Sequence, residues 1–217
     1  MEAARTLKRD LFGLVRTADR NGTRVVVRDA GAAAFGLGWL ARTLLRREAS
    51  ALRALAGLNA VPALIAAGRD VAIREYVIGD PLQVARCRDP GFYREAARVL
   101  RSMHRRNVVH NDLAKEPNLL VTPAGSPVFI DFQLAVVAKR RHKLFRILAR
   151  EDIRHLLKHK RTYCPDALTQ RERRLLASPS LPSLWFRRTV KPVYLFITRR
   201  ILGWSDREGA GDRSLRR

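Results

Sequence analysis

The sequence has few cysteines, few acidic residues and no long apolar run, and each scarcity excludes a class of protein. Its 217 residues include two cysteines, Cys87 and Cys164, which have neither the spacing of zinc ligands nor the pairing of a disulfide-rich secreted domain. The first five residues, MEAAR, are not followed by the apolar core of a signal peptide. We therefore expect a cytoplasmic protein without a zinc site or a disulfide framework.

Acidic residues are scarce relative to basic ones. The chain has 20 Asp and Glu against 43 Lys and Arg, a net charge of +23 at pH 7. Such a charge attracts anionic partners, namely nucleic acid, membrane headgroups or an acidic glycolipid. However, 36 of the basic residues are arginine, in a chain rich in Ala and Leu, and GC-rich coding produces the same bias. A functional basic face and a compositional bias both explain the charge.

The C-terminal segment mixes aromatic residues with arginines. Residues 184–188 are LWFRR and residues 194–204 are YLFITRRILGW. Because cations interrupt the apolar run, it is not a transmembrane helix. It predicts either a helix lying on the inner face of the cell membrane or a core helix with its arginines outside. Pro192 divides the segment and favours the second. The last residues, 206–217, predict a polar tail.

Glycine is sparse where a phosphate-binding loop would need it. The chain has no GxGxxG motif, so we assign no nucleotide contact to the N-terminal segment. The dipeptide Asn21-Gly22 instead predicts a turn, and the sequence RVVVRD at 24–29 predicts the strand that follows it.

The most informative stretch is VVHNDLAKEPNLLV at 108–121, together with FIDF at 129–132. The apolar runs at 119–121 and 128–130 have the composition of β-strands. They flank the segment TPAGSP, whose proline and glycine residues indicate a turn. The sequence therefore predicts a hairpin here.

Polar side chains stand at both ends of this hairpin. Asp112 and Asn118 precede its first strand, and Asp131 follows its second. An antiparallel hairpin brings these ends together, so the three side chains are predicted to converge. Hard oxygen ligands for Mg²⁺, with one carboxylate to orient an attacking hydroxyl, are what phosphoryl transfer needs. The alternative is an Asp-rich β-turn with His110 as its cap.

A strong helix pattern covers Trp39 to Leu58. Glu48 falls on the same face as the apolar residues Leu45 and Leu52. A carboxylate within an apolar stripe is costly unless a cation meets it, so we expect a basic partner. The alternative is a residue at the rim of the core, kept solvated by its neighbouring arginines.

Two further helices are predicted on either side of the hairpin. One has an apolar stripe between Phe92 and Met103 and leads into Val108. The other covers 144–160 and begins within a short distance of Asp131, so no long segment separates them.

The order of His110, Asp112, Asn118, hairpin and Asp131 resembles the catalytic and metal loops of the protein-kinase-like superfamily. It is most similar to the compact bacterial branch of RIO-like kinases and lipopolysaccharide-core (Kdo/heptose) sugar kinases. That resemblance implies that Asp112 is the catalytic base and that His110 braces its loop. It also implies that Lys115 neutralises the transferred phosphate and that Asn118 and Asp131 bind metal.

The same resemblance assigns a nucleotide-binding half. It supplies a cation for Glu48 on the third strand of the small lobe, which here is Arg28 in place of the usual lysine. The segment 74–82, which ends in Gly-Asp-Pro, resembles the hinge between lobes. Backbone groups of Glu75 and Val77 would there bind adenine. An ordinary strand that ends in a turn predicts the same residues.

Other positions depart from the kinase pattern. Asn118 follows Asp112 by six residues instead of five, and Gln133 replaces the glycine after Asp-Phe, which should stiffen the metal loop. The missing activation segment after Asp131 points away from conventional regulated protein kinases. Asp152, on the next helix, is expected to be structural.

These expectations combine into one hypothesis. The fold is predicted to be α+β and two-lobed, with a β-rich N-lobe carrying one helix (1–79), a mainly helical C-lobe (80–205) and a tail (206–217). The predicted function is ATP- and Mg²⁺-dependent transfer of the γ-phosphate to a hydroxyl of a protein Ser/Thr or a lipid-linked sugar. The alternative is a catalytically inactive kinase-like scaffold that binds an anionic membrane surface or RNA.

Overall fold

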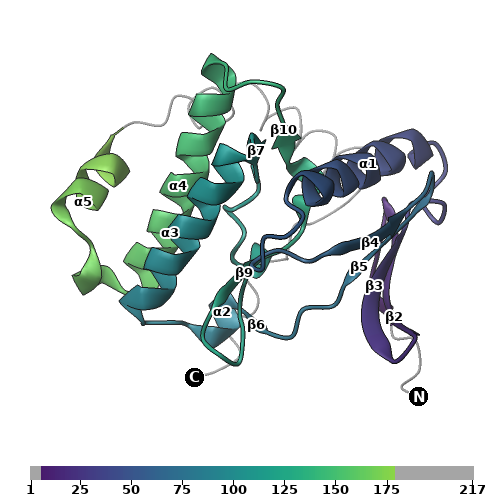
Figure 1. Ribbon diagram of the computed structural model, residues 1–217, viewed down its shortest axis with the longest axis horizontal. Helices are drawn as coiled ribbons and strands as arrows, with labels where there is room; N and C mark the ends of the chain where they lie inside the picture. The colour runs from purple at the N-terminus through teal and green to yellow at the C-terminus, as the bar shows by residue number, and fades with distance from the viewer. Residues whose placement is uncertain (1–5, 179–217) are drawn as a thin grey trace. The chain divides into compact units, whose positions relative to one another are not determined.

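The chain combines a small antiparallel sheet with several helices and is therefore an α+β protein, as the sequence predicts (Figure 1). The computed structural model describes residues 6–178. The predictions for 184–204 and for the tail at 206–217 lie outside these residues. No helix within 6–178 is both long enough and apolar enough to cross a membrane. Cys87 and Cys164 are free thiols.

The N-terminal half contains a five-stranded sheet in the order β1-β2-β3-β5-β4, with every neighbouring pair antiparallel. Its strands are β1 (Thr6–Asp10), β2 (Gly13–Arg20), β3 (Thr23–Asp29), β4 (Leu64–Ala67) and β5 (Val71–Glu75). The predicted turn at Asn21-Gly22 joins β2 to β3, and both of its residues have positive φ, at 55° and 76°. Two such residues form the tight turn that suits a twisted hairpin.

Helix α1 (Gly38–Ala54) joins β3 to β4 and packs against β4 and β5 (Figure 1). Leu45 and Leu52 are buried on its inner face, as predicted. The helix ends four residues before the predicted Leu58. The chain forms a turn after Ala54. Gly57 lies in this turn with a φ of 76°, a left-handed conformation that cannot continue an α-helix.

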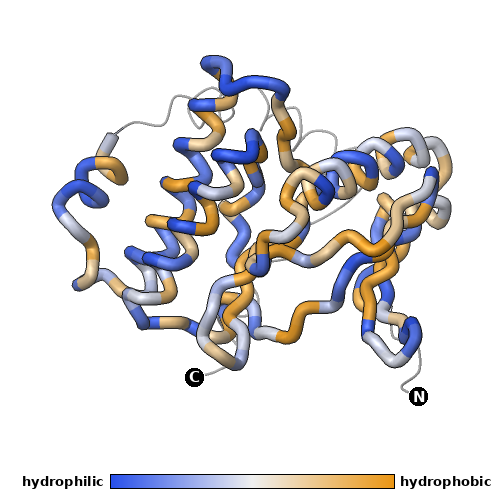
Figure 2. Tube along the Cα trace, viewed as in Figure 1, coloured by the Kyte–Doolittle hydropathy of each residue, from blue (hydrophilic) through white to orange (hydrophobic). Residues whose placement is uncertain are grey.

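The C-terminal half is mainly helical, and its helices α3 and α4 pack together (Figure 1). Its helices are α2 (Leu82–Ala85), α3 (Pro90–Arg105), α4 (Lys143–Tyr163) and α5 (Gln170–Ala177). Asp89 caps α3 by accepting the main-chain N–H groups of Gly91 and Phe92. Apolar and polar residues alternate along α3 and α4 (Figure 2). The predicted inner stripe of α3 is buried at Phe92, Ala96, Leu100 and Met103.

Short strands lie in the segments between these helices. They are β6 (Asp80–Pro81), β7 (Val108–Val109), β8 (Leu119–Val121), β9 (Pro127–Phe129) and β10 (Val136–Val137). The predicted hairpin is confirmed as β8–β9, although its second strand begins and ends one residue earlier than expected. Strand β7 pairs with β10, so the loops before and after the hairpin are fastened side by side.

Candidate active site

The loop between β7 and β8 brings Asp112 and Asn118 into direct contact. Asn118 ends a short 3₁₀ turn, η1 (Glu116–Asn118), and its Nδ2 donates to the main-chain oxygen of Asp112 at 2.9 Å and to Oδ2 at 3.0 Å. The Ile130 N–H donates to the Asn118 main-chain oxygen at 3.0 Å, and Asp131 is the next residue. The hairpin therefore brings its two ends together, as the sequence predicts.

Main-chain hydrogen bonds close the loop between Asp112 and Asn118 on itself. The Lys115 N–H points to the Asp112 carbonyl at 3.4 Å, and the Asn118 N–H donates to the Lys115 carbonyl at 3.2 Å. The Lys115 Nζ lies 3.0 Å from Asp112 Oδ2, and its side chain is 61% exposed. The predicted base and the predicted phosphate-neutralising cation are thus neighbours at the surface of the loop.

His110 is completely buried and lies between the two loops. Its Nε2 is 2.9 Å from the main-chain oxygen of Ile130, and its ring centroid is 4.6 Å from that of Phe132. Asn111 follows in a left-handed conformation and donates from Nδ2 to the Leu134 carbonyl. His110 therefore packs inside the loop junction.

Asp152, at the centre of α4, binds the main chain of this junction through its carboxylate. Its carboxylate is 1% exposed and accepts the main-chain N–H of His110 on Oδ2 at 2.8 Å and that of Asn111 on Oδ1 at 2.9 Å. The His104 ring nitrogen lies 3.2 Å from the same Oδ2. Asp152 therefore has the structural position that the sequence suggested, but its partners could not be named from sequence.

Helix α4 supports the loop at two more points. His159 Nε2 lies 2.7 Å from the main-chain oxygen of Leu113, and the Tyr163 hydroxyl donates to the Glu116 carboxylate. Together with the contacts of Asp152, these two contacts hold residues 110–116 against helix α4.

Asp131 adopts a left-handed backbone conformation, with φ 63° and ψ 69°. It immediately precedes a second 3₁₀ turn, η2 (Phe132–Leu134), whose Phe132 is buried. Asp131 Oδ1 accepts a hydrogen bond from Gln133 Nε2 at 2.6 Å. Gln133 Oε1 in turn accepts from Arg28 Nη2 on β3 at 2.8 Å. A hydrogen-bonded chain therefore connects the candidate metal ligand to the sheet.

Glu48 meets two arginines and not one. Its Oε2 lies 3.6 Å from Arg28 Nη1, and its Oε1 lies 3.2 Å from Arg74 Nε. Arg74 pairs with Val26 in the sheet, two residues from Arg28 on β3, so both arginines project from the same face. Arg28 was predicted, whereas Arg74 was missed, because its position beside Arg28 depends on the pairing of two strands that are distant in the sequence.

The alternative in which Glu48 is a solvated rim residue is wrong. Its side chain is buried, at 3% exposure. Burial raises the pKa of Glu48 above its usual value, and the charges of Arg74 and Arg28 offset only part of this increase. An acid buried in this way is tolerable because two guanidinium groups face it.

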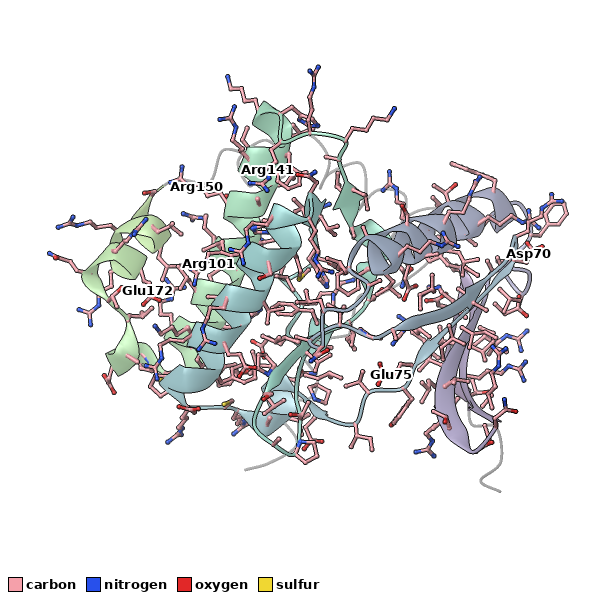
Figure 3. All side chains as sticks on the ribbon, viewed as in Figure 1. Asp70, Glu75, Arg101, Arg141, Arg150 and Glu172 are labelled. Carbon is pink, nitrogen blue, oxygen red and sulfur yellow. The ribbon has the colours of Figure 1, made fainter. Side chains whose placement is uncertain are left out.

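The predicted adenine-binding residues have different surroundings. The Glu75 N–H donates to the Ala63 carbonyl at 2.9 Å, and its carboxylate accepts the Ala63 N–H at 3.1 Å (Figure 3). Its side chain lines a pocket of about 670 Å³ formed with the end of α1 and with β4. Val77 forms no main-chain hydrogen bond with another residue in the described range 6–178. The Glu75 amide is thus already paired, while the Val77 amide is available to a ligand.

The side chains at the loop junction offer hard oxygen atoms of the kind that Mg²⁺ binds. Within 6–178 no three His, Cys, Asp or Glu side chains gather around a common point. Asn118 turns its Nδ2 towards Asp112, which leaves its Oδ1 for a ligand, and Asp131 retains Oδ2. Mg²⁺ typically binds one or two such protein oxygens, together with water and substrate phosphates.

The chain matches no protein-family model and no curated protein sequence.

The stability of this helical support is expected to depend on pH. Burial lowers the pKa of His155 to about 4 and also lowers the pKa of His159, despite the hydrogen bond of His159 to the Leu113 carbonyl. As the pH falls below 6.5, the unfolded chain gains protons before the folded chain does. Urea unfolding should show the free energy of unfolding falling between pH 6.5 and about 4, by up to about 1.4 kcal/mol per pH unit from His155, with a further decrease from His159.

Replacing His155 with Gln isolates this contribution, and the pH dependence should flatten. His142→Asn is the matched control, because His142 is exposed at the start of the same helix and the new side chain can still accept the Phe145 N–H. Equal flattening in both variants, or in neither, would contradict the assignment.

Proposed function

We propose that this protein is an ATP- and Mg²⁺-dependent phosphotransferase with a compact two-lobed kinase-like fold. The observation that carries the proposal is the junction of two loops at the hairpin ends. There Asp112, Asn118 and Lys115 are in mutual contact, and Asp131 follows the residue bonded to Asn118. Such an arrangement suits the positioning and electrostatic stabilisation on which phosphoryl transfer depends.

The architecture supports the same proposal. A five-stranded antiparallel sheet precedes a mainly helical half, and one helix, α1, lies in the chain between β3 and β4. Its Glu48 faces Arg28 of β3, the pairing that the kinase resemblance implies. Only a short connection with strand β10 separates Asp131 from α4, which suits a compact enzyme without a long activation segment.

Each residue has a role in the proposed reaction. Asp112 orients the acceptor hydroxyl and receives its proton, and its carboxylate lies 3.0 Å from the exposed Lys115. Lys115 meets the negative charge of the transferred phosphoryl group. Asn118 and Asp131 hold Mg²⁺, which neutralises the nucleotide phosphates when bound. His110 braces the loop through its contact with the Ile130 carbonyl.

The nucleotide is positioned by Arg28, which Glu48 holds in place, and its adenine is bound along the chain from Glu75 to Val77. The two candidate acceptors are a protein Ser/Thr and a sugar hydroxyl on an anionic lipid. The net charge of +23 suits a cytoplasmic enzyme that contacts an anionic membrane surface peripherally. Labelled ATP supplied to a bacterial lysate, later divided into protein, lipid and RNA fractions, identifies the acceptor class by the labelled fraction.

Mg-ATP is expected to raise the melting temperature of the wild-type protein and to be hydrolysed slowly without acceptor. Asp131→Ala should lose both effects, since it removes a metal ligand. The control Asp166→Ala, which changes an exposed aspartate just after α4, should retain them. A thermal-shift assay and an ATPase assay measure both.

If Mg-ATP fails to stabilise the wild-type protein, the enzyme proposal is wrong. A non-catalytic scaffold would then account better for the basic charge. Its binding to RNA would weaken steeply as salt is raised.

A further inference from the structure

Two residues that depart from the kinase-like pattern, Arg28 and Gln133, contact each other although they are 105 positions apart in the chain. Arg28 stands where the resemblance implies lysine, and Gln133 stands where it implies glycine. Arg28 Nη2 donates to Gln133 Oε1 at 2.8 Å, and Gln133 Nε2 donates to Asp131 Oδ1 at 2.6 Å. The two departures therefore form one structural unit that ends on the candidate metal ligand.

We propose that Gln133 is a positioning residue that couples Arg28 to Asp131 and sets the carboxylate for Mg²⁺; this inference rests on the proposed function. Gln133 itself touches neither metal nor substrate. Its hydrogen bond occupies Oδ1 of Asp131 and leaves Oδ2 to face the Mg²⁺ ion.

The amide group of Gln133 sets the direction of the hydrogen bonds that run from Arg28 through Gln133 to Asp131. Guanidinium groups only donate hydrogen bonds, and ionised carboxylates only accept them. Between Arg28 and Asp131, the Gln133 side chain can satisfy both neighbours in one orientation only, with its oxygen towards Arg28 and its nitrogen towards Asp131. Arg28 thus determines the orientation of Gln133, and Gln133 determines that of Asp131.

The other end of this hydrogen-bonded chain is an ion pair with a buried carboxylate. Arg28 uses a different nitrogen, Nη1, towards the buried Glu48, while Arg74 holds the second oxygen of Glu48 at 3.2 Å. A planar guanidinium can serve two acceptors from two separate nitrogens, whereas lysine would present a single ammonium group. Arginine at position 28 and glutamine at position 133 are therefore suited to each other.

The backbone around Asp131 strengthens the effect. Asp131 is held in a left-handed conformation, and the next residue, Phe132, is buried against His110. With the main chain fixed in this way, the remaining freedom of the carboxylate is rotation of its side chain, which the bond from Gln133 restricts. Partners that orient a metal ligand typically contribute 10–100-fold to metal affinity or activity.

The test measures how ADP binding depends on Mg²⁺ concentration, by calorimetry, so that no turnover is required. In Gln133→Met, which keeps the length of the side chain but not its hydrogen bonds, the Mg²⁺ concentration for half-maximal ADP binding should rise about 10–100-fold. ADP binding in EDTA should change little. Gln133→Glu can still accept from Arg28 but places a negative charge beside Asp131, so its Mg²⁺ requirement should also rise.

Gln170→Met is the matched control, because Gln170 is exposed at the start of α5, and it should bind like the wild type. The nucleotide-free unfolding midpoint of each variant separates a loss of folding from a loss of positioning. Adding Arg28→Lys to Gln133→Met should raise the Mg²⁺ requirement little beyond that of Gln133→Met alone, since both changes break the same hydrogen-bonded chain. Because Arg28 also positions the nucleotide, Arg28→Lys should in addition weaken ADP binding in EDTA.

The outcomes separate the two proposals. If the wild type binds no Mg-ADP, the proposed function fails and this inference fails with it. If the wild type binds Mg-ADP and folded Gln133→Met has the same Mg²⁺ requirement, or Gln170→Met shifts equally, the inference is overturned while the proposed function stands.

Discussion

Replacing Asp152 with alanine is expected to destabilise the protein by about 2–6 kcal/mol, since it leaves two main-chain N–H groups without their acceptor at roughly 1–3 kcal/mol each. Those groups belong to His110 and Asn111, and the carboxylate that accepts them is 1% exposed. Water cannot readily replace an acceptor at such a site. The same change should also disorder the loop that carries Asp112, so phosphotransfer should be lost. Urea unfolding at constant pH measures the stability change.

The control is Asp166→Ala, at an exposed aspartate beyond the end of α4, which should change stability by no more than about 0.5 kcal/mol. Asp152→Asn is a second informative variant, because its amide can accept one of the two N–H groups but directs a donor at the other. Its stability should fall between those of the wild type and Asp152→Ala. If Asp152→Ala and the control are equally stable, α4 does not anchor the loop.

Replacing Asp112 with alanine is expected to lower the transfer rate by about 10²–10⁴-fold, the usual contribution of a positioned acid–base group. The fold should survive, because Asn118 still donates to the main-chain oxygen of residue 112. Nucleotide and Mg²⁺ binding should be largely retained, since Asn118 and Asp131 hold the metal. Single-turnover kinetics measure the rate, and calorimetry with Mg-ADP measures binding.

Asp112→Asn keeps the shape of the side chain and removes its charge, so it should lose activity to a similar extent. This variant also checks that the alanine has not simply disturbed Lys115, whose Nζ lies 3.0 Å from the carboxylate. A loss of Mg-ADP binding as large as the loss of rate would assign Asp112 to ligand binding and not to orientation of the acceptor.

Features that depend on neighbours in the sequence were predictable. The hairpin β8–β9 follows from two apolar runs around a Pro- and Gly-rich turn, and β3 follows from Asn21-Gly22 and a run of valines. The inner faces of α1 and α3 follow from helical periodicity. The approach of Asn118 to the segment before Asp131 was predictable for the same reason, because a hairpin fixes the distance between its own ends.

Features that depend on packing between distant segments were not predictable. Strands β7 and β10 are two residues each, too short to give a periodic signal, and they form because their segments lie side by side. Arg74 was not recognised as a partner of Glu48, because the pairing of β3 with β5 could not be known in advance. Two partners of Asp152 are main-chain N–H groups, which leave no signature in a sequence, and the third is the side chain of His104 on another helix.

The sequence by itself determined the order of His110, Asp112, Asn118 and Asp131, and therefore which polar atoms stand at the ends of the hairpin. It also placed Glu48 on an apolar face that required a cation. Only the tertiary structure decided how these groups are held. The buried carboxylate of Asp152 on α4 holds the loop, and hydrogen bonds from Arg28 through Gln133 connect Asp131 to the sheet. Residue type and local spacing are properties of the chain, whereas a hydrogen bond across 105 positions exists only after both halves have packed together.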